Sequence, residues 1–288
     1  MMIRTTLIAS TLAVVFSTAQ GAEPLQLKIY NADGNSFNVN STLVYGEKEA
    51  MVIDAGFTRA DALRIAANVL DSGRQLKTIL VSQADPDYYF GVETLKQIFP
   101  QAEVVATAAV LEKINAKMAG KLAFWTPKMG VNAPKTPVLP KALQGNTLTV
   151  DGEKVEVRGT QGLLAHRPYV WIPSVKAVVG NIGVFGNMHV WTADTQTAAE
   201  RTAWVAQLDE MAALKPAVVV PGHMKEGTKL DIGTITYTKG YLQAFEKNAA
   251  ATKSSAELIE RMQKAYPDAP PGMALDIGAK VNKGEMKW

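Results

Sequence analysis

The sequence predicts an α/β (α+β) protein built as a four-layer αββα sandwich, in which two β-sheets pack face to face and helices cover both outer surfaces. Two observations favour this fold class. Short apolar runs typical of strands are followed by mixed strand and helix patterns, and this order occurs twice along the chain. With 288 residues, 47% of them hydrophobic, the chain can bury such a core in a single domain.

The first half is expected to begin with strands and then to alternate between strands and helices. Thr58-x-x-Asp61 has the pattern of a capping box, and Gly73 ends the helix that follows it. Pro100 ends a second helical pattern that includes Leu95. The strands expected here are residues 27–30, 37–45, 50–53, 78–81 and 104–106, and a third helix is expected over 110–122.

The middle of the chain has a different composition. Residues 123–145 contain four prolines, and regular structure is not expected where prolines recur so closely. The segment therefore predicts a long ordered loop or lid.

The second half repeats the order of the first. Asp151-Gly152 is typical of a tight hairpin between strands 147–150 and 154–158. Strands 169–172 and 177–179 follow, and Thr197-x-x-Glu200 opens an amphipathic helix. A buried strand at 217–220 leads into a C-terminal helical segment, residues 234–288.

The N-terminus has the features of a secretory signal. Arg4 precedes an apolar stretch, and Ala19-Gln20-Gly21 offers small residues for cleavage. The apolar stretch is too short to span a bilayer. We therefore expect residues 1–21 to be a signal peptide, residues 22–288 to form the mature domain, and the protein to be periplasmic or secreted without membrane insertion.

Composition excludes several classes of function. The chain has 30 Lys and Arg against 27 Asp and Glu, a net charge of +3, which is too weak to predict nucleic-acid binding. It has no cysteine, so disulfides, thiolate metal ligands and thiol nucleophiles are excluded. It also lacks the Gly-x-Ser-x-Gly motif of serine hydrolases and the phosphate-binding Walker loop.

The stretch from Gln83 to Gly91 lies between a predicted strand and a predicted helix. Its spacing resembles His-x-His-x-Asp-His-x-x-Gly, with Gln83, Asp85 and Tyr88 at the three histidine positions. Further landmarks follow the same pattern in the same order: Asp54-x-Gly56, Gly162-Leu163, Gly180-Asn181 and Pro221-Gly222-His223. On these residues, over about 27–225, the chain resembles the metallo-β-lactamase superfamily.

The resemblance implies a metal hydrolase whose metal site is altered. The first zinc of the family would use positions 83, 85 and 163, where Leu163 cannot bind metal. The second would use positions 87, 88, 181 and 223, where Asn181 lacks the usual carboxylate. A dinuclear zinc site is therefore not expected, while Asp54 and Gly56 are expected to be structural.

A weaker site remains, which predicts a hydrolase of a small ester, lactone, amide or phosphoester. Asp85, Asp87 and His223 would hold one divalent ion, such as Mn²⁺, Fe²⁺, Ca²⁺ or a loosely bound zinc. Its bound water would attack the substrate, with Asp87 and Tyr88 as the catalytic residues. Further ligands could come from Gln83, His166 and Asn181.

Two alternatives stay open. In the first, the protein binds a small molecule without catalysis, in a pocket rimmed by aromatic and histidine side chains: Tyr89, Trp125, Trp171, His189 and Trp191. In the second, Asp85 or Asp87 is a general base and His223 a general acid, and no metal takes part. The sequence does not address the oligomeric state.

Overall fold

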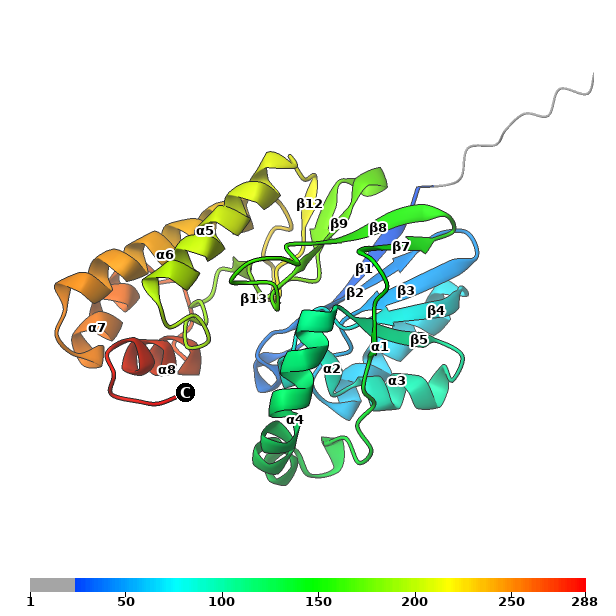
Figure 1. Ribbon diagram of the computed structural model, residues 1–288, viewed down its shortest axis with the longest axis horizontal. Coiled ribbons are helices and arrows are strands. Elements are labelled where there is room, and N and C mark those ends of the chain that lie inside the picture. The colour runs from blue at the N-terminus through cyan, green and yellow to red at the C-terminus, as the bar shows by residue number, and fades with distance from the viewer. Residues whose placement is uncertain (1–23) are drawn as a thin grey trace, which may run out of the picture.

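The computed structural model describes residues 24–288, and the predicted signal sequence lies outside them. Two sheets face each other, and helices cover the outer surface of each (Figure 1). The first sheet has the order β1-β2-β3-β4-β5-β6. Its strands are β1 (Gln26–Asn31), β2 (Asn40–Tyr45), β3 (Glu49–Ile53), β4 (Gln75–Leu80), β5 (Glu103–Ala106) and β6 (Lys141–Ala142).

The second sheet has the order β12-β10-β9-β8-β7, and a separate parallel pair, β11-β13, lies at the site described below. The strands are β7 (Thr147–Val150), β8 (Glu153–Arg158), β9 (Tyr169–Ile172), β10 (Ala177–Val179), β11 (Phe185–Gly186), β12 (Val218–Val219) and β13 (His223–Met224). The predicted hairpin is confirmed. Asp151 and Gly152 both have positive φ, 48° and 85°, as a tight two-residue turn requires.

Helices of the first half cover the first sheet, and those of the second half cover the second. They are α1 (Arg59–Ser72), α2 (Pro86–Tyr89), α3 (Val92–Ile98), α4 (Ala108–Met129), α5 (Ala198–Ala213), α6 (Gly233–Ala251), α7 (Ser255–Ala265) and α8 (Met273–Asn282). Both predicted capping boxes are present, at the start of α1 and of α5. Within residues 24–288, none of these helices has the length and apolarity needed to cross a membrane.

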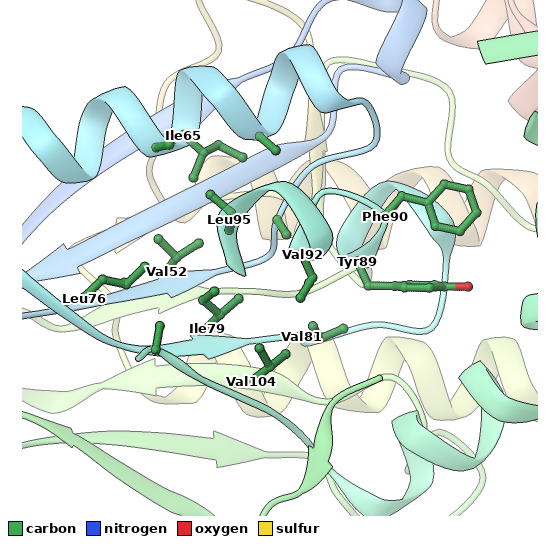
Figure 2. Close-up of a cluster of buried hydrophobic side chains, with 14 of the residues drawn as sticks. Val52, Ile65, Leu76, Ile79, Val81, Tyr89, Phe90, Val92, Leu95 and Val104 are labelled. Atoms are coloured by element: carbon green, nitrogen blue, oxygen red, sulfur yellow. The ribbon is translucent and has the colours of Figure 1, made fainter. Parts of the chain in front are cut away.

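Alternating side chains of the strands fill separate cores. Val52 and Ile79 face the helices of the first half, and Figure 2 shows them packed beneath Ile65 of α1 and Leu95 of α3. The neighbouring Ile53 belongs to the core between the two sheets. Because a strand points successive side chains to opposite faces, this division gives the predicted four layers.

The predicted loop at 123–145 differs from the structure in its first part, because α4 continues to Met129 with Pro127 in its last turn. A proline this close to a helix end disturbs little of the hydrogen-bond ladder. Trp125 also packs edge-on against Phe37 and Phe57, which stabilises this turn on the body of the protein. A short 3-10 helix, Gly130–Asn132, follows, and the irregular part runs from there to β6.

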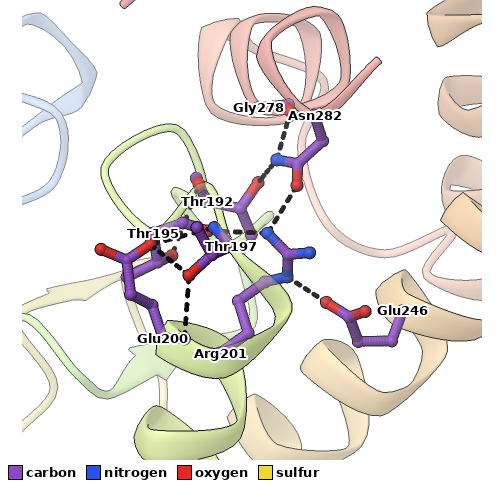
Figure 3. Close-up of polar contacts among 8 residues, drawn as sticks. All are labelled: Thr192, Thr195, Thr197, Glu200, Arg201, Glu246, Gly278 and Asn282. Carbon is purple, nitrogen blue, oxygen red and sulfur yellow. Dashed lines mark hydrogen bonds and ion pairs between the residues drawn. The ribbon is translucent and has the colours of Figure 1, made fainter. Parts of the chain in front are cut away.

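The C-terminal helices are held to the second half by Arg201 of α5. Its Nη1 donates to Thr195 O at 2.7 Å and to Asn282 Oδ1 at 2.6 Å, and its Nε pairs with Glu246 of α6 (Figure 3). Gly278 of α8 lies so close to the 192–195 turn that a Cβ there would be 2.4 Å from the hydroxyl of Thr192. This network positions α8 beside the pocket described next.

Candidate functional site

A pocket of about 690 Å³ opens between α4, the loop after β11 and the segment around α8. Most of its wall is aromatic or aliphatic. The lining includes Phe37, Phe57, Phe124, Trp125, Ile182, Phe185, Met188, Trp191, Pro270, Pro271, Met273 and Trp288. Its polar lining includes Asp85, Asp87, Lys117, Lys121, His189, Asp194 and His223. The predicted pocket residues Trp125, His189 and Trp191 are therefore part of it.

The loop after β4 contains the predicted motif, and Asp54, which follows β3, holds this loop through hydrogen bonds. The Asp54 carboxylate accepts hydrogen bonds from the backbone N–H and the hydroxyl of Ser82, at 2.8 and 2.7 Å. Burial raises the pKa of Asp54 to about 7. Its backbone has φ of 68°, an uncommon conformation that these bonds support.

Gln83 and Asp85 are each engaged by other groups. The Gln83 amide is buried and donates to Pro168 O at 2.9 Å. Asp85 is the N-cap residue of α2, and its Oδ1 lies 3.5 Å from Lys121 Nζ of α4. Burial and the nearby Asp194 raise the pKa of Asp85.

Asp87 and His223 meet at the pocket, as their predicted roles require. Asp87 Oδ2 lies 3.5 Å from His223 Nε2, and both side chains are about nine-tenths buried. His223 Nδ1 lies 2.9 Å from Phe37 O, and its ring stacks on Phe185 at 5.3 Å. The bond to Phe37 O assigns the Nδ1 proton, so Nε2 is the free nitrogen that faces Asp87.

Burial shifts the pKa values of both members of the pair in the direction of their uncharged forms. Burial lowers the pKa of His223 to about 4. Burial and the charge of Asp85 raise the pKa of Asp87 well above its usual value. Both shifts therefore disfavour a charged Asp87–His223 ion pair.

Two further polar atoms are buried behind the pair. Within residues 24–288, Tyr88 Oη and Asn181 Oδ1 have no hydrogen-bond partner. Asn181 Nδ2 donates to Val220 O at 3.0 Å. Gly222 permits the close approach, because a Cβ there would lie 2.2 Å from Asn181 O and 2.5 Å from Tyr88 Oη.

Other residues singled out from the sequence lie elsewhere. Leu163 is 61% exposed, and His166 is half-buried and does not line the pocket. Burial and the adjacent Arg167 lower the pKa of His166 to about 4. Tyr89 and Trp171 belong to the two helix-facing cores rather than to the pocket.

Sequence reasoning missed Arg167, which is 5% exposed behind the pocket wall. Its guanidinium lies 4.1 Å from the ring centroid of Trp204, and Nη2 donates to Ile182 O at 3.4 Å. Its charge acts against the rise in the pKa of Asp85. Arg167 thus brings a fixed positive charge to the side of the pocket where the resemblance places metal ligands.

A sequence profile described as metallo-β-lactamase superfamily matches residues 34–223, more than half of the chain. The chain belongs to the metallo-β-lactamase superfamily. Both the predicted family and the predicted fold class are confirmed. No curated protein matches the sequence.

Solved structures of the superfamily share the fold at low sequence identity. A β-lactamase domain protein from Burkholderia ambifaria has a TM-score of 0.62 and 13% identity, covering 96% of this chain and 88% of that chain. A metallo-β-lactamase family protein from Thermus thermophilus has a TM-score of 0.60 and 18% identity, covering 91% and 93%. The DIM-1 metallo-β-lactamase has a TM-score of 0.53 and 19% identity, covering 77% and 94%.

The residues of this superfamily member do not fit a dinuclear zinc centre. Gln83 is bonded to Pro168 O, Leu163 faces solvent, and Asp85 is paired with Lys121. Within residues 24–288, no three His, Asp or Glu side chains are grouped as metal ligands, so the predicted set of Asp85, Asp87 and His223 is not assembled. Of the positions that the resemblance assigns to metal ligands, Asp87 and His223 do face each other, and both are ligands of the kind zinc prefers.

Proposed function

We propose that this protein binds a small, largely apolar organic molecule in the aromatic pocket of a hydrolase-like fold. The volume and the lining of the pocket are the observations that support the proposal. Its volume of about 690 Å³ lies within the range of about 300–1,000 Å³ that is usual for small-molecule sites. Its mainly apolar wall and few polar groups are also typical of such sites.

The arrangement of the polar groups supports binding rather than dinuclear metal chemistry. The acidic side chains of the pocket have partners of their own, at 3.5 Å in each case: Asp85 with Lys121, Asp194 with Lys117, and Asp87 with His223. Such pairs leave little uncompensated negative charge to attract a cation. An apolar ligand can enter without breaking any of them.

A thermal-shift screen of neutral, cationic and anionic aromatic and aliphatic fragments tests the proposal. Stabilisation by one class of fragment is expected, and Trp288→Ala should weaken it, because Trp288 lines the pocket and is 48% exposed. Leu70→Ala is the matched control, since Leu70 is 64% exposed on α1 and lies outside the pocket. A screen without any hit, or hits that Trp288→Ala leaves unchanged, would contradict the proposal.

A second candidate function is hydrolysis of a small ester, lactone, amide or phosphoester with one weakly held ion. The observation that favours it is the orientation of His223, whose Nδ1 is held by Phe37 O so that Nε2 faces Asp87. Asn181 Oδ1 is buried behind them, unpaired within residues 24–288. Asp87 and His223 would hold the ion, which when bound lowers the pKa of a water.

Elemental analysis of the purified protein tests this candidate. A stoichiometric divalent metal that is lost in Asp87→Asn would support it. A metal-free protein that shows no hydrolysis with any added divalent ion would exclude it.

We also propose that the protein acts outside the cytoplasm. The proposal depends on the signal-like composition of residues 1–21. Cell fractionation and N-terminal sequencing test it. A mature chain that retains residues 1–21 in the cytoplasm would contradict it.

A further inference from the structure

Lys117 and Lys121 of α4 place two cations at the pocket. They are four residues apart in the sequence and so lie on the same face of the helix. Both line the pocket, and their side chains are 48% and 21% exposed, so a ligand can reach them. A lysine ammonium has donors and no acceptor, so any hydrogen-bonding partner of these groups must supply an acceptor.

The contacts that the two lysines already make leave their donors available. Lys117 Nζ lies 3.5 Å from Asp194 Oδ1, and Lys121 Nζ lies 3.5 Å from Asp85 Oδ1. Lys121 Nζ also lies 5.6 Å from the ring centroid of Trp288. Both ion-pair distances exceed the length of a charge-assisted hydrogen bond, which is about 2.7–2.9 Å. The lysines are therefore held at the pocket without strong hydrogen bonds to these carboxylates.

The carboxylate of Asp194, in contrast, already has hydrogen-bond donors on both oxygens. Its Oδ2 accepts from Trp191 Nε1 at 2.6 Å, and its Oδ1 accepts from Trp288 Nε1 at 3.1 Å. The unused hydrogen-bonding capacity on this side of the pocket therefore belongs mainly to the two lysines.

Positive charge is in excess around Asp194. Burial opposes the ionisation of Asp194, but the hydrogen bond from Trp191 and the charges of three cations lower the pKa of its carboxyl. These cations are Lys117, Lys121 and Arg167. Asp85 is the second carboxylate beside them, so the cations outnumber the carboxylates. Glu200 also acts on Arg167, but its carboxylate is already bound by Thr197 at the start of α5.

This excess matches a ligand with a single negative charge. A dianion such as a phosphate monoester would bring more negative charge than the cations leave uncompensated. A carboxylate brings one charge and oxygen acceptors for the lysine donors.

The rest of the wall favours an aromatic body for the ligand. Phe124 and Trp125 of α4 pack edge-on, with ring centroids 4.9 Å apart. Trp191 and Trp288 pack edge-on at 5.0 Å, and all four rings line the pocket. Aromatic side chains bind planar rings by stacked and edge-on contacts.

We propose that the ligand is an aromatic monocarboxylate, whose carboxylate binds the ammonium groups of Lys117 and Lys121 and whose ring system lies against the aromatic wall. The proposal rests on the proposed binding function and adds to it the class of ligand. It assigns a specificity-determining role to the two lysines.

Three probes of the same shape test it by calorimetric titration at low ionic strength. 2-Naphthoate is an anion, 2-naphthamide is uncharged and 2-naphthamidine is a cation. 2-Naphthoate is expected to bind about tenfold more tightly than 2-naphthamide, because only the anion forms charged hydrogen bonds with both lysines. 2-Naphthamidine should bind most weakly. Binding of 2-naphthoate that is absent, or no tighter than that of 2-naphthamide, would overturn the proposal.

Three variants then assign the preference to these two lysines. The double variant Lys117→Met with Lys121→Met should bind 2-naphthoate no more tightly than 2-naphthamide. Lys117→Arg with Lys121→Arg keeps both charges and should retain the preference. The control Lys113→Met, at an exposed position of α4 outside the pocket, should also retain it. A tenfold preference that persists in a folded double methionine variant would overturn the proposal, and if that variant does not fold, the three probes on the wild type still decide.

The screen described above separates the two proposals. If fragments bind in a manner sensitive to Trp288→Ala but 2-naphthoate does not, the ligand class is wrong and the binding function stands. If no fragment binds at all, both proposals are overturned.

Discussion

Replacing Arg201 by methionine is expected to destabilise the protein and to weaken ligand binding. Arg201 is 7% exposed and joins α5 to α6, to α8 and to the turn before α5. Methionine preserves much of the apolar stem and removes all the donors. Since Met273 and Ala274 of α8 line the pocket, loosening α8 should also change the pocket wall.

The magnitude follows from the partners of Arg201. Two buried or half-buried acceptors, Thr195 O and Asn282 Oδ1, each lose a charged hydrogen bond of about 1.5–3 kcal/mol. Glu246 is 41% exposed and can return to water, so its pairing adds little. Methionine also removes the desolvation cost of the buried guanidinium charge, which offsets part of the lost stability. We expect a net destabilisation of about 2–4 kcal/mol, or a lower Tm by about 5–15 °C.

Urea denaturation followed by tryptophan fluorescence measures this loss. The matched control is Lys239→Met, which removes a cation from a more exposed pair with Asp209 and should cost less than about 1 kcal/mol. If Arg201→Met costs no more than Lys239→Met, the network does not hold α8 as described. If Arg201→Met leaves the ligand affinity unchanged, the position of α8 does not affect binding in the pocket.

Two further predictions concern Asp54 and Gly222, which support the residues of the site. Because burial raises the pKa of Asp54 to about 7, its contribution to stability is fully present below about pH 4 and is lost as the pH rises through 7. Relative to Asp54→Asn, the wild type should therefore lose at least about 1 kcal/mol between pH 4.5 and pH 8 in urea titrations; equal curves would refute the shift. Gly222→Ala should lower the free energy of unfolding by about 1–3 kcal/mol, because its Cβ would meet Asn181 O at 2.2 Å. Gly120→Ala, in α4 with open space around it, should be neutral or stabilising, and a similar loss at both positions would argue against the close packing at Gly222.

Local patterns in the sequence were enough for much of the fold. The capping boxes at Thr58 and Thr197 and the hairpin at Asp151-Gly152 depend on residues close together in the chain, and all three are present. The last turn of α4 was not predictable, since its stability depends on Trp125 packing against distant aromatic side chains. The strand expected over 37–45 begins only at Asn40, because Phe37 and Asn38 have φ of 57° and 55°, a left-handed conformation that a strand does not contain.

The site was predictable where it lies at strand ends. Asp87 and His223 follow buried strands, and this placement brings them together. Arg167 and Trp288 come from a loop and from the end of the chain after α8, and their positions depend on packing between distant segments. One signal pointed toward Arg167: a basic residue next to Pro168, close to the third landmark of the superfamily.

The central claim is that the pocket binds a small organic molecule without a metal ion. Calorimetric titration of the tightest-binding fragment from the thermal-shift screen into protein dialysed against EDTA, repeated after addition of excess Zn²⁺, tests it most directly. We predict saturable binding to the EDTA-treated protein, with a Kd that Zn²⁺ leaves unchanged within about twofold. Binding that appears only after Zn²⁺ is added would contradict this account and favour a metal centre at Asp87 and His223.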